Sequence, residues 1–291
     1  MCLIDHFVLV AGNLPDARQH YQQIGFNVAP DGIHPFGTYN ANMYFRKGPM
    51  IETLSIENHI KYVEAIEAGN TFVKNDALFR AEHGDEGFSH IAMTSTDAEL
   101  DHRSFQEHGI SGGNIVSFSR QFEQPDGQME TVAVKLAFAT HPKAQCGFYF
   151  TCQDIAVPEI DRSTLLKHEN GALGVNHAIS CSNEPLLYVD LLKELSRSSE
   201  IHANKQKVKC LFPNGSLSII TPEKLKQEFG ISLSTHGTSL QHKGLIFTVA
   251  DIKKTELFFI QNKIVFKRHN ERLITQSNPE SAEFFAFEQN R

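Results

Sequence analysis

Hydrophobic and polar positions follow a pattern that recurs four times along the chain. In each copy, a polar residue and a histidine precede a run of apolar residues of the kind that favours β-strands. The four histidines are His6, His90, His177 and His242. Self-similarity of this kind is typical of a structural unit that the chain repeats.

Each run is followed by residues with helical spacing and then by short apolar runs between turn residues. Helices are predicted over residues 13–24, 96–109, 183–195 and 251–260. Further strands are predicted over residues 26–28, 41–45, 50–56, 113–120, 131–138, 148–152, 207–212, 216–221, 264–269, 272–276 and 283–287, with a hairpin turn at 124–127. The repeated unit is therefore a strand, a helix and about three more strands.

A single unit of this kind leaves one face of its sheet uncovered, so we expect the four units to pair. The predicted fold class is α+β, with four βαβββ modules paired into two domains. Residues 158–171 have weak periodicity and mark the boundary. The domains are therefore expected to span residues 1–160 and 161–291.

Composition and charge narrow the possible partners. Acidic residues outnumber basic ones by 34 to 27 and no block of Lys and Arg stands out, so neither nucleic acid nor an anionic membrane surface is expected. The apolar runs are too short to span a bilayer, and the first residues lack the pattern of a signal peptide, so a cytoplasmic protein is expected. The 5 cysteines contain no CxxC pair and predict free thiols.

An ordered set of short motifs runs through the chain. They are Leu3-Ile4-Asp5-His6, the segment from His34 to Asn40, Met50-Ile51-Glu52-Thr53-Leu54, Ser119-Arg120, Pro125-Asp126-Gly127, Phe148-Tyr149-Phe150-Thr151-Cys152-Gln153, Pro158-Glu159 and His168-Glu169-Asn170-Gly171-Ala172. In this order they resemble the glyoxalase-like-domain proteins of the vicinal oxygen chelate superfamily, which also contains glyoxalase I and the extradiol dioxygenases. The resemblance is most specific between residues 3 and 174. It implies two glyoxalase-like domains, in which paired modules curl around a cleft.

The resemblance also implies a metal site in the first pair of modules. His6 and His90 begin the first strands of modules 1 and 2, Glu52 lies in the last strand of module 1, and the superfamily points these positions into the cleft. Two imidazoles and a carboxylate suit a divalent ion of Zn, Fe, Ni or Mn and leave positions open for substrate. The superfamily normally supplies a fourth ligand, Glu, from the last strand of module 2. This chain departs from that pattern and offers Asp154 there.

Neighbouring residues complete the predicted site. His34 is expected to border the cleft and, with Glu52, to take part in proton transfer. Arg120 is expected to hold an anionic substrate, and Asn40 to contribute a substrate contact. The alternative for the loop from His34 to Asn40 is that it only shapes a tight connection around Gly37.

A second constellation, formed by His177, His242 and Glu288, has the residue types of a metal site but the wrong register. When the predicted helix starts at Leu14 and Ile252 are aligned, the positions equivalent to His6 and Glu52 fall two residues away from His242 and Glu288. We therefore expect the function to lie in the first half of the chain.

Two functions compete at this point. The first is a divalent-metal-dependent enzyme of the lyase, isomerase or dioxygenase type, acting on a small oxygen-rich molecule through Lewis-acid catalysis. The second is a metal-free protein of the same fold that binds or sequesters a small molecule. Either one takes a small-molecule ligand, and a homodimer is possible for both.

Overall fold

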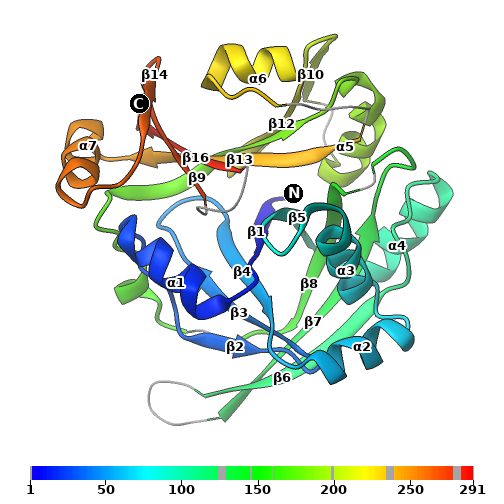
Figure 1. The fold of residues 1–291 in the computed structure, drawn as a ribbon. Helices are drawn as coiled ribbons and strands as arrows, with labels where there is room; N and C mark the ends of the chain where they lie inside the picture. The colour runs from blue at the N-terminus through cyan, green and yellow to red at the C-terminus, as the bar shows by residue number, and fades with distance from the viewer. Residues whose placement is uncertain are drawn as a thin grey trace.

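Two curved eight-stranded sheets, one from each half of the chain, form the molecule (Figure 1). The structure, a computed structural model, describes residues 2–123, 129–144, 146–158, 160–197, 200–233, 239–277 and 283–290, with the side chains of residues 122 and 123 left out. The predicted hairpin turn at residues 124–127 and Glu159 of the Pro158-Glu159 motif lie outside the described residues.

The first sheet has the strand order β2-β3-β4-β1-β5-β8-β7-β6 and contains modules 1 and 2. Module 1 consists of β1 (Ile4–Val10), α1 (Leu14–Gln23), β2 (Asp31–Ile33), β3 (Thr38–Met43) and β4 (Met50–Ile56). Module 2 consists of β5 (Gly87–Ser95), α4 (Ala98–Glu107), β6 (Val116–Glu123), β7 (Met129–Ala139) and β8 (Phe148–Ala156). Two further helices, α2 (His59–Glu67) and α3 (Thr71–His83), connect the modules.

The second sheet repeats this topology in the order β10-β11-β12-β9-β13-β16-β15-β14. Module 3 consists of β9 (Ala172–Cys181), α5 (Val189–Ser196), β10 (Ile201–Asn204), β11 (Lys207–Phe212) and β12 (Gly215–Ile220). Module 4 consists of β13 (Gln241–Val249), α7 (Ile252–Gln261), β14 (Lys267–His269), β15 (Arg272–Gln276) and β16 (Phe284–Gln289). Helix α6 (Pro222–Phe229) lies between them, and short 3-10 turns cover Ser163–Leu165 and Pro185–Tyr188. The predicted α+β fold of four βαβββ modules is confirmed.

Side-chain caps explain why the helices of modules 1, 2 and 4 begin close to where the sequence predicts. In module 3, α5 begins only at Val189, after a 3-10 turn and without a side-chain cap. The Asn13 side chain accepts a hydrogen bond from the backbone N–H of Asp16, and Asp97 and Asp251 cap α4 and α7 in the same way. After α1, Gly25 takes a φ of +88°, which a residue with a Cβ rarely adopts. The local sequence therefore sets both ends of α1.

Several predicted elements differ from the structure. Residues 26–28 form no strand. The apolar side chain of Phe26 is explained by packing, because its ring centroid lies 5.0 Å from that of Phe247 in the second sheet. The second strand of module 1 is instead β2. Asn40 lies within β3 and not in a loop. Strand β10 and helices α2, α3 and α6 were not predicted. Strands β2 and β10 have three and four residues, partly exposed, which is too short for a clear alternation.

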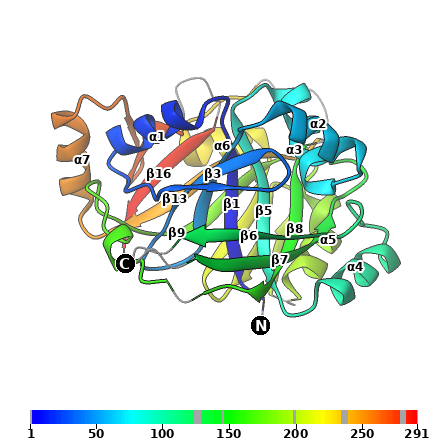
Figure 2. The ribbon, with the colours of Figure 1, turned by 90° about the horizontal axis from the view of Figure 1, so that it is seen from below.

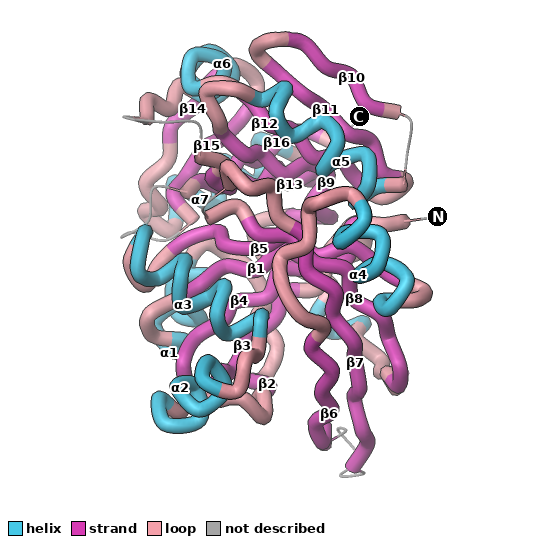
Figure 3. The backbone as a smooth tube through the Cα atoms, turned by 90° about the vertical axis from the view of Figure 1, so that its right-hand side faces the viewer, coloured by secondary structure: helices cyan, strands magenta, loops and turns pink. Residues whose placement is uncertain are grey.

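The two sheets share one hydrophobic core. Along β1, Phe7 and Leu9 point into this core, whereas His6 and Val8 point to the opposite face of the first sheet. Along β13, Leu245 and Phe247 point into the same core. Figure 3 shows the second sheet stacked on the first. One face of each sheet thus packs against the other half of the molecule, and the opposite face takes no part in this shared core.

The first sheet curls around its free face. In the view from below, β6 and β7 cross over β1 and β5 (Figure 2). The curl brings the two edge strands together. Gly32 on β2 consequently lies against the side chain of Arg120 on β6.

The remaining sequence predictions concern cysteines and membranes. All five cysteines are free, as predicted. Among the helices of the described residues, none is both long and apolar enough to cross a membrane.

Candidate functional site

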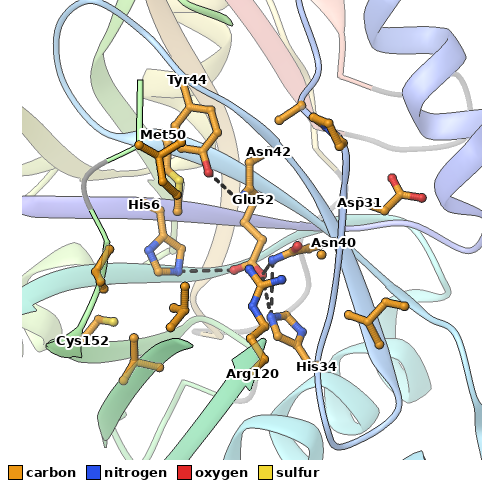
Figure 4. A pocket seen from close by; sticks show the side chains of 18 of the residues that line it. His6, Asp31, His34, Asn40, Asn42, Tyr44, Met50, Glu52, Arg120 and Cys152 are labelled. Carbon is orange, nitrogen blue, oxygen red and sulfur yellow. Dashed lines mark hydrogen bonds and ion pairs between the residues drawn. The ribbon is translucent and has the colours of Figure 1, made fainter. Parts of the chain in front are cut away.

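The curl of the first sheet encloses a cavity of about 1020 Å³ (Figure 4). Its apolar wall includes four phenylalanine rings, those of Phe36, Phe72, Phe118 and Phe150. Its polar lining includes Asp5, His6, His34, Asn40, Asn42, Tyr44, Glu52, Arg120, Asp154 and Arg162. The size and the mixed lining are those of a small-molecule site.

Strand register places His6 and Glu52 side by side on the cavity face. β1 and β4 run parallel, with His6 opposite Met50 and Val8 opposite Glu52. Paired residues of neighbouring strands point to the same face of the sheet, and three of these four, His6, Met50 and Glu52, line the cavity. The alternation that buries Phe7 in the shared core therefore also exposes His6 to the cavity.

Glu52 is the centre of a buried polar cluster. Its Oε2 lies 3.4 Å from His6 Nε2, and its Oε1 accepts a hydrogen bond of 2.5 Å from Asn40 Nδ2 (Figure 4). His34 Nε2 lies 3.8 Å from the same Oε1. His6 Nδ1 in turn lies 2.5 Å from Asp5 Oδ2. The result is a continuous chain from Asp5 through His6 and Glu52 to His34.

The electrostatics of this cluster favour a carboxylate at Glu52 and a cation at His6. Burial alone would raise the pKa of Glu52, but its hydrogen bond and charge interaction with His6 lower it to about 2. Burial alone would lower the pKa of His6, but hydrogen bonds and charge interactions with Asp5 and Glu52 raise it to about 10. At neutral pH the two side chains form a buried ion pair.

His34 is neutral in the same surroundings. Burial, followed by the charge of Arg120, lowers the pKa of His34 to about 4 against an opposing effect of Glu52. Its Nδ1 lies 2.9 Å from Thr38 Oγ1, and its Nε2 lies 3.4 Å from Asn40 Nδ2. If Nδ1–H donates to Thr38, then Nε2 carries the lone pair. The imidazole also stacks on the Phe36 ring at 5.1 Å between centroids, which fixes its plane.

Arg120 lies next to this cluster, and none of the described residues pairs with its guanidinium. Its guanidinium lies close to Gly32 and Asn40 on the facing strands β2 and β3. Within the part of the chain that the structure describes, the Arg120 side chain makes no hydrogen bond or ion pair. A guanidinium that lines a cavity and lacks a carboxylate is available to an anionic ligand.

The structure brings together five of the residues predicted for the site, namely His6, His34, Asn40, Glu52 and Arg120. Asp154 also lines the cavity, but its side chain is exposed. His90 does not line it. The His90 ring is fully buried among the rings of Phe72, Phe148 and Phe150.

The four predicted metal ligands do not form a ligand set in this arrangement. β5 places His90 opposite Val8, and Val8 stands between His90 and Glu52. Among the described residues, no group of three His, Cys, Asp or Glu side chains is placed to hold a metal ion. The residues as arranged do not fit the predicted ion, and we derive no step through one.

Sequence analysis missed four charged residues of the cavity, namely Asp5, Asp31, Asp161 and Arg162, and Arg162 is the one cation among them. Arg162 lies in the segment that joins the two sheets, and its guanidinium carbon lies 4.7 Å from the centroid of the Tyr44 ring. The path of this segment depends on tertiary contacts, such as the hydrogen bond from Asn27 Nδ2 to the Thr164 carbonyl. No local signal in the sequence marks Arg162 as a cavity residue.

The second constellation serves structural contacts. His177 Nε2 hydrogen-bonds Ser218 Oγ at 2.8 Å, and His242 Nε2 donates to the Phe148 carbonyl at 3.2 Å. Glu288 accepts from Arg272 Nε at 2.8 Å. Each of the three polar groups already has a partner, in agreement with the register argument.

Fold and cavity together define a protein of the vicinal oxygen chelate class. A family model described as a glyoxalase-like domain matches residues 4–196, and the chain belongs to this family. A comparison with curated proteins found no match.

Three solved structures illustrate the likeness. A hypothetical protein from Staphylococcus aureus has 13% identity and a TM-score of 0.66, with 100% of both chains covered. A triple mutant of 4-hydroxymandelate synthase from Streptomyces coelicolor has 12% identity and a TM-score of 0.59, with 99% of this chain and 93% of that chain covered. A catechol 2,3-dioxygenase has 12% identity and a TM-score of 0.54, with 99% and 87% covered. At these identities the likeness shows the fold alone.

Proposed function

We propose that this protein is an enzyme that binds a small, oxygen-rich organic anion in the cavity of the first sheet and moves a proton on it. The observation that carries the proposal is the Arg120 guanidinium, which has no ion-pair or hydrogen-bond partner in the described parts of the chain and lies beside the buried acid–base groups Glu52 and His34. Buried groups with displaced pKa values in an apolar cavity are typical of an active site.

Arg120 supplies the anchor. Its planar fork of N–H donors matches the two oxygens of a carboxylate, and such charge-assisted pairs are among the stronger hydrogen bonds in proteins. A carboxylate held there would place its neighbouring carbon near His34 and Asn40, which lie beside the guanidinium. A 2-oxo acid, with a carbonyl next to the carboxylate, has the adjacent oxygens that the superfamily resemblance implies.

His34 is the proposed proton acceptor. The charge of Arg120 is one of the causes that lower the pKa of His34. A bound anion would offset that charge, and the pKa of His34 would rise toward the range in which imidazole works as a general base. Glu52, held as a carboxylate by His6 and Asn40, would stabilise the imidazolium that forms.

The proposal predicts exchange of protons next to a carbonyl. We would incubate the protein with 2-oxobutanoate in D₂O and follow the loss of the C3 proton signal by NMR. Removal of a proton from C3 leaves an enolate, which takes a deuteron back from solvent. The expected result is exchange catalysed by the wild type, slower by about 100-fold in His34→Gln.

Arg120→Gln should raise the KM for the same exchange by about tenfold, because a charge-assisted hydrogen bond is lost. Arg268→Gln is the matched control, since Arg268 pairs with Glu256 on the surface of the second half. Unchanged kinetics in Arg120→Gln would overturn the proposal. Binding of 2-oxobutanoate by the wild type without any exchange would instead favour the metal-free binding protein.

The sequence also predicted a divalent-metal-dependent enzyme, and a measurement of metal retention tests that prediction. The protein would be incubated with Zn²⁺, Fe²⁺, Ni²⁺ or Mn²⁺, desalted, and its metal content measured. Retention of a metal by the wild type but not by Glu52→Gln would show that the ligands rearrange around the ion. In that case the metal would supply Lewis-acid chemistry in this cavity.

A further inference from the structure

The cavity holds a second guanidinium that has no ion-pair or hydrogen-bond partner among the described residues. Arg162 lines the cavity from the segment between the two sheets, and its side chain lies over the face of the Tyr44 ring. In the described parts of the chain, neither its side chain nor that of Arg120 forms an ion pair or a hydrogen bond. Two guanidinium groups in one cavity repel each other unless an anion lies between them or binds to each.

The contrast with the other arginines is the first argument. The chain carries a net charge of −7, so carboxylates are abundant. Arginines in ion pairs are Arg18, Arg80, Arg197, Arg268 and Arg272. Arg46 and Arg103 have no such partner among the described residues, but they do not line the cavity. Unpaired guanidinium groups in the cavity therefore indicate an anion that the ligand brings.

No acidic residue of the cavity forms an ion pair with Arg120 or Arg162 among the described residues, although the charge of Arg162 acts on Asp154. Asp31 pairs with Arg18, and both Asp5 and Glu52 are held by His6. Asp161 Oδ1 accepts a hydrogen bond from the Ser163 backbone N–H at 2.8 Å. Asp154 is exposed at the cavity edge. The cavity thus satisfies most of its own negative charges and leaves its two guanidinium groups open.

The two cations lie on different sides of the Glu52 cluster. Arg120 is next to His34, which faces Oε1 of Glu52. Arg162 is next to Tyr44, and its charge acts on Asp154, which also feels the charges of Asp5 and His6. His6 faces the other oxygen of Glu52, Oε2. A molecule that reaches both guanidinium groups therefore passes over the proposed reacting groups.

We infer that the ligand is a dianion, an organic acid with one anionic group on Arg120 and a second on Arg162, joined by a carbon skeleton. The inference rests on the proposed function, because it extends the same anion site. The volume of about 1020 Å³ accommodates a skeleton longer than that of a single small acid, and the phenylalanine wall suits its carbon atoms. Carboxylates and phosphates share the required chemistry.

Isothermal titration with matched acids tests the inference. The probes are the straight-chain dicarboxylates from butanedioate to octanedioate, the monocarboxylates of the same lengths, and the corresponding alkyl bisphosphates. One dicarboxylate or bisphosphate should bind the wild type at least about tenfold more tightly than the monoanion of equal length. Arg162→Gln should abolish this preference and leave the affinity for the monocarboxylate unchanged.

Controls separate this inference from the proposed function. Arg46→Gln, which removes an exposed guanidinium outside the cavity, should behave as the wild type does. Circular dichroism and thermal unfolding confirm that each variant is folded. A dianion preference that persists in Arg162→Gln, or equal affinities of the wild type for mono- and dianions, would overturn the dianion while Arg120→Gln still weakens binding. If Arg120→Gln weakens no probe, the proposed function fails as well.

Discussion

Gly32 shows how a residue without chemistry of its own shapes the site. The guanidinium of Arg120 crosses the strand at Gly32, and a Cβ built on this glycine would collide with Arg120 Nη1 and lie 2.6 Å from Asn40 Oδ1. Both obstructing atoms are ends of flexible side chains, so a methyl group would displace them without breaking the backbone. The absence of a side chain at position 32 therefore sets the position of the proposed anion anchor.

Gly32→Ala should weaken anion binding with little effect on folding. Displacement of Arg120 and Asn40 is expected to lower the affinity for the probe anions by about tenfold, and the free energy of unfolding should change by less than about 1 kcal/mol. Titration calorimetry and urea denaturation measure the two quantities. Ala133→Gly on β7 is the control variant, and it should leave the affinity for the probe anions unchanged. Undiminished affinity in Gly32→Ala would contradict this account of Arg120.

Helix α6 shows at the level of elements how the free face of the second sheet is covered. The free face of the second sheet carries Ile179, Ile246 and Phe284, and these residues pack against Leu225 and Phe229 of α6. Both helix residues are fully buried. The corresponding face of the first sheet carries the Glu52 cluster. Helices α2 and α3 cover part of that face through Tyr62 and Phe72, and the cavity lies beside the part that they cover.

Truncation of the α6 anchor should affect stability and not binding. Phe229→Ala is expected to lower the free energy of unfolding by about 3–5 kcal/mol, because it leaves a cavity in a packed cluster. Leu257→Ala on α7, where the side chain is 53% exposed, should cost less than about 0.5 kcal/mol. Chemical denaturation gives both values. A loss of anion affinity in folded Phe229→Ala would show that the second sheet takes part in the site.

At the level of the whole molecule, buried polar contacts tie the two halves together. His242 of β13 donates from Nε2 to the Phe148 carbonyl of β8 and accepts at Nδ1 from Ser180 Oγ at 2.8 Å. Its ring lies between those of Phe88 and Tyr149. Burial lowers the pKa of His242 to about 3, so the folded protein holds it neutral. We propose that the halves unfold as one unit because they share this junction and one core.

This junction predicts a loss of stability in acid. His242 has an ordinary pKa near 6.5 in the unfolded chain, so the unfolded state binds the proton first and stability falls as the pH drops below about 6.5. Between pH 6.5 and 5.5 the wild type should lose about 1 kcal/mol more than His242→Gln. Urea denaturation at both pH values measures this difference. His202→Gln, which changes an exposed histidine, should keep the wild-type dependence, and an equal slope in His242→Gln would disprove the assignment.

Much of the fold and part of the site could be predicted from the sequence. The four modules follow from local patterns, such as the cap of Asn13 and the alternation along β1. His6 and Glu52 were predicted as neighbours, and the parallel register of β1 and β4 places them together. Helix α6 and strand β2 were not predicted, because one is defined by the cluster that it covers and the other by its pairing with β3.

The sequence by itself determined the number, order and type of the modules and the residue types available to the first cavity, because caps and alternation act over a few neighbouring residues. Tertiary structure alone decided how those side chains are used. It buries His90 behind phenylalanine rings, brings Arg162 into the cavity from the connecting segment, and pairs His6 with Glu52. These outcomes depend on contacts between residues far apart in the chain, and no local pattern contains them.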